Sequence, residues 1–199
     1  MPLPPKLALA TKNPGKIQEI LEICRDWPVD WITAEGADWP DIAETGETYR
    51  ENALLKAMEV ARVLGVPAVA DDSGIEVDAL GGGPGPRSAR FAGEHATDAE
   101  NLALLLSRVA EVPEQERTAR YRCVAACAWP EGQAIDVEET CEGRITLEPR
   151  GSGGFGYDPA FVPAGYEWTM AELSPSEKNL ISHRGKALRA LGEALRDEG

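Results

Sequence analysis

The stretch Pro67-Ala68-Val69-Ala70-Asp71-Asp72-Ser73-Gly74 decides how the chain is organised. Its apolar half predicts a short buried strand over Ala68–Ala70 that ends at two adjacent carboxylates. Ionised carboxylates seldom lie beside a buried strand unless a metal ion, a lysine or a catalytic water compensates for the lost hydration. Turn chemistry is the alternative interpretation, because Asp, Ser and Gly are ordinary turn residues. Successive side chains of an extended chain point to opposite faces, so Asp71 and Asp72 are expected to do different jobs.

Strands and helices alternate on both sides of this stretch. Before it, the predicted elements are a strand at Lys6–Ala10, a helix capped by Asn13, a strand at Trp31–Ala34 and a helix from the Thr48–Glu51 capping box to Gly65. The second helix is expected to turn these residues inward: Leu54, Ala57, Met58, Ala61 and Leu64. After the stretch come a helix capped by Thr97, a strand at 121–129, a return strand through Ile135 and Val137, a helical turn at Ser174 and a final helix from about His183, capped by Ser182. This order predicts an α/β sheet in one domain over residues 1–199.

Composition excludes several classes of protein. The formal net charge of −14 argues against binding a DNA or RNA polymer, although a locally positive pocket can still hold a small polyphosphate. No apolar run is long enough to span a membrane, and the N-terminus lacks the pattern of a signal peptide. The four cysteines include no C-x-x-C pair, which predicts buried thiols in a reducing compartment. We therefore expect a cytoplasmic protein.

The first strand leads directly into Thr11-Lys12-Asn13-Pro14-Gly15-Lys16. A helix that begins here, at the carboxyl end of a strand, presents its free amides as an anion site. Thr11 adds a hydroxyl donor and Lys16 adds a positive charge. A well-capped helix with a solvated lysine is the alternative, since the segment lacks the full G-x-x-x-x-G-K-[ST] pattern. We assign the whole segment as a candidate phosphate site.

A glycine-rich segment, Gly153-Gly154-Phe155-Gly156-Tyr157-Asp158-Pro159, favours a flat ligand. Glycines such as Gly156 let a ring approach the backbone closely. An aromatic face such as Phe155 offers stacking, and Asp158 can accept a hydrogen bond from a base. A loop with a packed Phe is the alternative interpretation.

Ser182-His183-Arg184-Gly185 opens the last helix with cationic residues, which oppose the helix dipole and so indicate function. If Lys178, His183 and Arg184 converge on a base, they offer donors. Donors pair with the keto oxygen of hypoxanthine or xanthine, whereas the amino group of adenine would leave them unpaired. Such rejection can reach about four orders of magnitude.

Glu44, just before the helix that carries Lys56, is a candidate second carboxylate beside Asp72. Mg²⁺ prefers a few carboxylates together with water and substrate phosphates, and this sparse set fits it. The motifs together predict a metal-assisted nucleotide site.

The motif set resembles the inosine triphosphate pyrophosphatase family from Lys6 to Leu195. The motifs are Thr-x-Asn-x-x-Lys, Glu-Thr-Gly-x-Thr, Glu-Asn-Ala-x-x-Lys-Ala, Asp-Asp-Ser-Gly, Ser-Ala-Arg-Phe, Gly-Gly-Phe-Gly-Tyr-Asp-Pro and Ser-His-Arg-Gly. The resemblance implies Mg²⁺-dependent hydrolysis of ITP, dITP and XTP to the monophosphate and pyrophosphate. It also implies an elongated, mixed α/β fold of two lobes with a central cleft, and a homodimer.

The resemblance also assigns roles by position. Asp72 matches the general base and metal-associated carboxylate, and Glu44 matches a metal ligand. The residues that match the phosphate contacts are Thr11, Asn13, Lys16, Lys56 and Ser73. Phe155 matches the residue that stacks on the base. The base pocket falls on Tyr157, Asp158, Lys178, His183 and Arg184. Two alternatives stay open: a pyrophosphatase of related fold that acts on modified pyrimidine nucleotides, and a nucleotide-binding regulator without hydrolysis.

Overall fold

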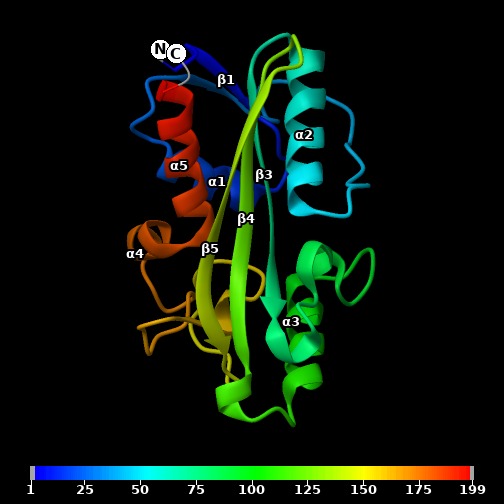
Figure 1. The fold of residues 1–199 in the computed structure, drawn as a ribbon, viewed down its shortest axis with the longest axis vertical. Coiled ribbons are helices and arrows are strands. Elements are labelled where there is room, and N and C mark those ends of the chain that lie inside the picture. Colours follow the sequence, from blue (N-terminus) through cyan, green and yellow to red (C-terminus); the bar gives the residue numbers. More distant parts are fainter. Residues whose placement is uncertain (1–2, 198–199) are drawn as a thin grey trace. The chain divides into compact units, whose positions relative to one another are not determined.

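The structure, a computed structural model, describes residues 3–197. Within that range six strands form one sheet in the order β2-β1-β3-β4-β5-β6 (Figure 1). The strands are β1 (Lys6–Leu9), β2 (Asp30–Ile32), β3 (Ala68–Val77), β4 (Thr118–Ala128), β5 (Ala134–Ile145) and β6 (Phe161–Pro163). The α-helices are α1 (Pro14–Ile23), α2 (Tyr49–Leu64), α3 (Asp98–Val109), α4 (Pro175–Ile181) and α5 (His183–Asp197). Strand β1 is parallel to β2 and β3, whereas β5 and β6 are antiparallel. The predicted α/β class, with a mixed sheet flanked by helices, is confirmed.

The chain divides into two compact units. Of the described residues, unit 1 comprises 3–72, 123–139 and 184–197, and unit 2 comprises 73–122 and 140–183. Strands β3, β4 and β5 each contribute residues to both units.

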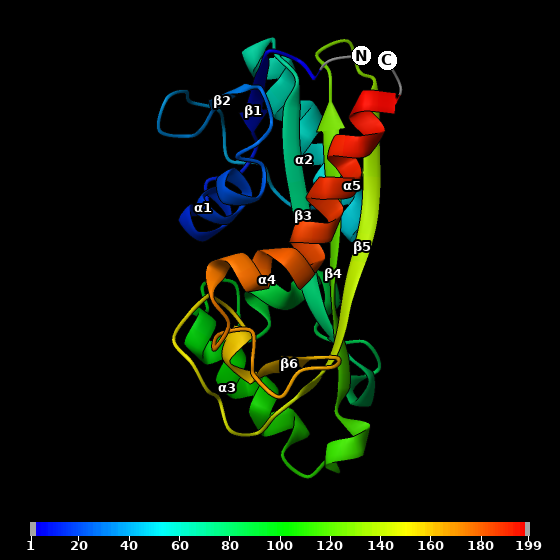
Figure 2. The ribbon, with the colours of Figure 1, turned by 90° about the vertical axis from the view of Figure 1, so that its left-hand side faces the viewer.

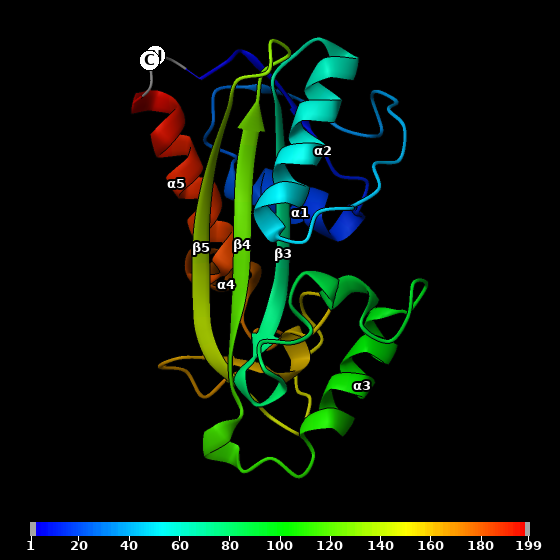
Figure 3. The same ribbon diagram turned by 45° about the vertical axis from the view of Figure 1, so that its right-hand side comes forward.

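Unit 1 has a hydrophobic core on each face of its strands. On one face α1 and α5 supply Ile20, Leu188 and Leu191, which pack with Leu7 and Val69 of the strands (Figure 2). On the other face α2 packs on the alternate strand residues (Figure 3). Both faces of these strands are therefore covered by helices, which is why Leu7–Leu9 of β1 and Ala68–Ala70 of β3 are apolar without alternation.

Unit 2 has a single core among its described residues, formed by α3, the ends of the long strands and β6. Phe161 is fully buried at its centre. Thr97 caps α3 as predicted, in a capping box with Glu100, and Ser174 begins α4 in a second capping box with Glu177.

Two local predictions are corrected by the structure. Strand β3 does not end at the carboxylates but continues from Ala68 to Val77, so Asp71 and Asp72 lie in mid-strand. The backbone stays extended here, although Asp, Ser and Gly favour turns, because cationic side chains compensate both buried carboxylates. Lys16 and Arg184 contact Asp71, and Lys56 contacts Asp72. On α2, Met58 is 41% exposed rather than inward, whereas Asn52 and Lys56 are buried. The helix turns a polar pair toward β3, which rotates Met58 outward.

The four cysteines are all free and buried, as predicted. Burial raises the pKa of Cys24 and of Cys127 to about 12. In residues 3–197 no helix combines the length and the apolar character that crossing a bilayer requires.

Candidate active site

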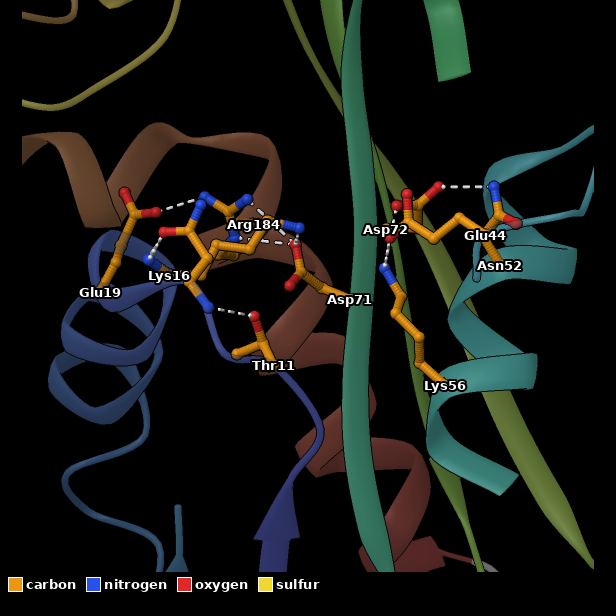
Figure 4. Close-up of polar contacts among 10 residues, drawn as sticks. Thr11, Lys16, Glu19, Glu44, Asn52, Lys56, Asp71, Asp72 and Arg184 are labelled. Carbon is orange, nitrogen blue, oxygen red and sulfur yellow. Dashed lines mark hydrogen bonds and ion pairs between the residues drawn. The ribbon is translucent and has the colours of Figure 1, made fainter. Parts of the chain in front are cut away.

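Strand β3 separates two polar clusters in unit 1. Figure 4 shows Asp71 on one side of the strand with Lys16, Glu19 and Arg184, and Asp72 on the other side with its own partners. Consecutive residues of an extended strand point in opposite directions, which produces this separation. The two carboxylates therefore have different surroundings, as the sequence predicted.

The cluster on the Asp71 side is a buried ion network. Asp71 Oδ2 lies 3.1 Å from Lys16 Nζ and accepts a hydrogen bond of 3.0 Å from Arg184 Nε. The Arg184 guanidinium also donates to Glu19. Both Asp71 and Arg184 are 2% exposed. Burial by itself would raise the pKa of Asp71, but the charges of Arg184, Lys16 and Lys56 outweigh it and hold that pKa far below its ordinary value. Asp71 is therefore the common anion that holds two cations.

The cluster on the Asp72 side is centred on Lys56. Its ammonium donates to Glu44 Oε1 at 2.6 Å and to Asp72 Oδ1 at 3.0 Å. Asn52 Nδ2 donates to the other Asp72 oxygen at 3.3 Å. Burial raises the pKa of Asp72, and the charges of Lys56 and Lys16 offset only part of that effect. A carboxylate with a raised pKa is a stronger base than an ordinary aspartate, which suits it to accept a proton from water.

Glu44 and Asp72 fit a magnesium site. Both carboxylates accept from the same ammonium, that of Lys56, at 2.6 and 3.0 Å, which brings them close together. Among residues 3–197 no group of three or more His, Cys, Asp or Glu side chains could hold a metal, so the protein offers two carboxylates rather than a full cage. Mg²⁺ commonly takes one or two carboxylates and completes its shell with water and substrate phosphates. The donor set matches that preference.

The start of α1 is built as the sequence predicts. Asn13 caps the helix, and its Oδ1 accepts a hydrogen bond of 3.1 Å from the Lys16 amide. Thr11 Oγ1 accepts a bond of 3.2 Å from the Asn13 amide. Lys12 points elsewhere in unit 1 and pairs with the exposed Asp41 at 2.7 Å.

Asp158 organises a third group, in unit 2. One oxygen accepts a hydrogen bond of 3.1 Å from the Tyr121 hydroxyl. The other accepts bonds from the Phe155 amide at 2.9 Å and from Lys178 Nζ at 2.6 Å. The Lys178 ammonium also lies 5.0 Å from the centre of the Phe155 ring. Asp158 is 3% exposed, so these donors supply the compensation that a buried carboxylate needs.

The loop around Phe155 is tied to the rest of unit 2 at several points. The Gly156 amide donates to Asp98 at 2.9 Å, and the buried Tyr157 hydroxyl donates to the Ser88 carbonyl at 2.7 Å. Gly154 has a φ of +69°, and a Cβ there would collide with the Asp158 carboxylate. Only glycine leaves room for the hydrogen bond that the Phe155 amide donates to Asp158.

Known proteins are similar to this chain over nearly its whole length. The Ham1 family model matches residues 7–194. A dITP/XTP pyrophosphatase of Streptomyces coelicolor is 49% identical over 96% of this chain and 98% of the relative, and one of Geobacillus kaustophilus is 50% identical over 94% and 93%. The chain belongs to the Ham1 family. The solved structure of a HAM1 protein from Coxiella burnetii is 41% identical and aligns with a TM-score of 0.87 over 96% of this chain and 98% of that one.

In this Ham1 family member the predicted site residues fall into two sets. Unit 1 holds Thr11, Lys12, Asn13, Pro14, Gly15, Lys16, Glu44, Lys56, Asp72 and Arg184, and unit 2 holds Ser73, Phe155, Gly156, Tyr157, Asp158, Lys178 and His183. The structure unites Glu44, Lys56 and Asp72 in one cluster, and Phe155, Asp158 and Lys178 in another. Arg184 bonds to Asp71 and Glu19 in unit 1, although its neighbour His183 belongs to unit 2.

Sequence reasoning missed three polar residues of these clusters. Asn52 precedes Lys56 by one helical turn, so the Glu-Asn-Ala-x-x-Lys-Ala motif already placed it on the same face. Glu19 follows Lys16 by three residues on α1, a spacing that also indicates a shared face. Tyr121 lies on β4, and the sequence pattern predicts only that it is a strand residue. No local pattern connects it to Asp158.

Proposed function

We propose that this Ham1 family member hydrolyses the non-canonical purine triphosphates ITP, dITP and XTP to the monophosphate and pyrophosphate. The relatives from Streptomyces coelicolor and Geobacillus kaustophilus are named for this activity on dITP and XTP. The observation that carries the proposal is the cluster of the half-buried Glu44 with the buried Lys56 and Asp72. It combines a base, a pair of metal-ligating carboxylates and a phosphate-compensating cation.

Unit 1 carries the chemistry in this proposal. Asp72 accepts a proton from the attacking water, and its raised pKa favours that transfer. Lys16 and Lys56 compensate the negative charge of the phosphates, together with the amides at the start of α1. Glu44 and Asp72 would hold Mg²⁺. When bound, that ion supplies charge neutralisation on the phosphate oxygens.

Unit 2 selects the base in this proposal. Phe155 offers a stacking surface, and Lys178 and His183 offer donors to the keto oxygen of hypoxanthine or xanthine. The amino group of adenine would leave those buried donors without acceptors, which accounts for rejection of adenine. Tyr157 and Asp158 contribute by fixing the loop around Phe155, through bonds to Ser88 and to the Phe155 amide.

We also propose that the protein works in the cytoplasm on free nucleotides, as a homodimer. The four free, buried cysteines support a reducing compartment. The net charge of −14 disfavours a nucleic acid polymer as partner.

A pyrophosphate-release assay over all common and deaminated nucleoside triphosphates tests the proposal. We expect rapid release from ITP, dITP and XTP, slow release from ATP, and loss of activity when EDTA removes Mg²⁺. A preference for modified pyrimidine triphosphates would assign the chain to the related pyrophosphatases. Binding of dITP with no release of pyrophosphate under any metal would indicate a regulator.

A further inference from the structure

Tyr121 contacts two of the predicted base-pocket residues at the same time, although no functional motif contains it. Its hydroxyl donates to Asp158 Oδ1 at 3.1 Å. Its ring stacks on the imidazole of His183, with 4.5 Å between centroids and 8° between planes. All three residues belong to unit 2.

The Tyr121 ring is itself held in place. Phe161 meets it edge-on with centroids 4.7 Å apart and planes at 61°, a favourable aromatic geometry. Tyr121 is 7% exposed and Phe161 is fully buried. The ring therefore has one orientation, set by the core of unit 2.

This fixed ring adds a constraint to two side chains whose last torsion is broad. The last torsion of a histidine or an aspartate side chain is broad, so neither residue sets its own plane. The stack restricts the His183 ring, and with it the direction in which an imidazole N–H donates. The hydrogen bond restricts the Asp158 carboxylate, which in turn holds Lys178 and the Phe155 amide.

We propose that Tyr121 is a positioning residue that sets the base selectivity of this enzyme by orienting His183 and Asp158. The inference rests on the proposed function, in which unit 2 binds the purine. Tyr121 acts through its two partners, with no contact to the reacting phosphates.

Two variants separate the hydroxyl from the ring. Tyr121→Phe removes the bond to Asp158 and keeps the stack on His183, whereas Tyr121→Leu removes both. For Tyr121→Phe we expect the KM for dITP to rise about fivefold with kcat near wild type, the size of one lost hydrogen bond. For Tyr121→Leu we expect a larger rise in KM and a narrower preference for dITP over dATP. Tyr166→Phe, at a tyrosine of the same unit outside this group, is the matched control.

Inhibition by inorganic tripolyphosphate distinguishes positioning from general damage. This probe has no base, so its inhibition constant should be unchanged in both Tyr121 variants. An equal loss of affinity for dITP and for tripolyphosphate would overturn the inference.

The histidines provide a readout that does not depend on activity. The chain has only two, His95 and His183, and His95 is exposed. In an untagged His95→Gln background, the single remaining imidazole reports on His183 by NMR. We expect a ring-current shift that persists in Tyr121→Phe and disappears in Tyr121→Leu. An unchanged His183 spectrum in Tyr121→Leu would overturn the inference.

Variants of His183 and Asp158 distinguish a failure of the Tyr121 inference from a failure of the proposed base site. If His183→Ala and Asp158→Asn alter the preference for dITP over dATP but Tyr121→Phe and Tyr121→Leu do not, the role of Tyr121 is wrong and the base site stands. If none of the four alters the preference, the assignment of unit 2 to the base is wrong.

Discussion

Asp71 and Asp72 are consecutive residues of β3 whose carboxylates are held by different cations on opposite sides of the strand (Figure 4). Lys16 and Arg184 hold Asp71, whose pKa falls, while burial beside a single close lysine leaves the pKa of Asp72 raised. The same residue type thus serves as an anchor at one position and as a candidate base at the next, because the local charge differs.

Asp72→Asn should reduce kcat by at least about a hundredfold, because the amide cannot accept the proton of the attacking water. Affinity for dITP should change little. Pyrophosphate release measures the rate, and calorimetry with the variant measures binding. Asp38→Asn, at an exposed aspartate, is the control. A turnover close to wild type in Asp72→Asn would exclude it as the base.

Lys16→Ala should raise the KM for dITP by about ten- to hundredfold, the loss expected for one hydrogen bond to a charged group. The ratio of ITP to ATP hydrolysis should stay the same, because the lysine belongs to unit 1 beside Asp71. Steady-state kinetics with both substrates check this, with Lys6→Ala at an exposed lysine of β1 as control. An effect on base choice alone would contradict the phosphate role.

Arg184→Met should lower the free energy of unfolding by about 3–5 kcal/mol, because it leaves Glu19 and Asp71 buried with less positive charge. Urea denaturation measures the change. Adding Asp71→Asn to Arg184→Met should restore part of the loss, since one of the uncompensated charges is then removed. Arg62→Met, which breaks an exposed pair with Glu59 on α2, should leave stability unchanged. Equal changes in the free energy of unfolding for Arg184→Met and Arg62→Met would show that the buried network stabilises the protein no more than an exposed ion pair.

Gly154→Ala should destabilise the protein and raise the KM for dITP, because the new Cβ meets the Asp158 carboxylate and the φ of +69° is unfavourable for alanine. Gly165→Ala is a matched control, with a φ of +83° and open space around it. Thermal unfolding and kinetics of the two variants separate backbone strain from the collision. If the collision matters, Gly154→Ala should lose more thermal stability than Gly165→Ala. Equal losses of stability would show that the collision with Asp158 has no effect.

The buried thiols should not react with iodoacetamide in the folded protein at about pH 8, because the thiolate is the reactive form. Burial raises the pKa of Cys24 from 9.0 to about 12, because it disfavours the thiolate. The contribution of the buried thiol to folding stability is therefore fully present below pH 9 and is lost as the pH rises through 12. Mass spectrometry should find labels only after unfolding in urea. Rapid labelling of Cys24 or Cys127 in the native protein would contradict their burial.

Local sequence signals determined most of the elements and the identity of the chemistry. Asn13, the capping boxes and Gly65 begin or end helices through bonds within a few residues, so they could be predicted without the fold. The alternation of side chains along an extended strand also predicts, from the sequence alone, that Asp71 and Asp72 point to opposite faces.

Only the tertiary structure decided which donor or cationic side chain pairs with each buried carboxylate. The bond from Tyr121 to Asp158 spans 37 positions of the chain, and the bonds of Arg184 to Asp71 and Glu19 span 113 and 165. No local pattern encodes such pairs, because they arise when strands and helices distant in sequence pack together. The sequence alone placed Arg184 beside His183 in one pocket, whereas the fold buries its guanidinium against two carboxylates. A buried charge takes the partner that packing brings within hydrogen-bond distance, and that choice belongs to the whole fold.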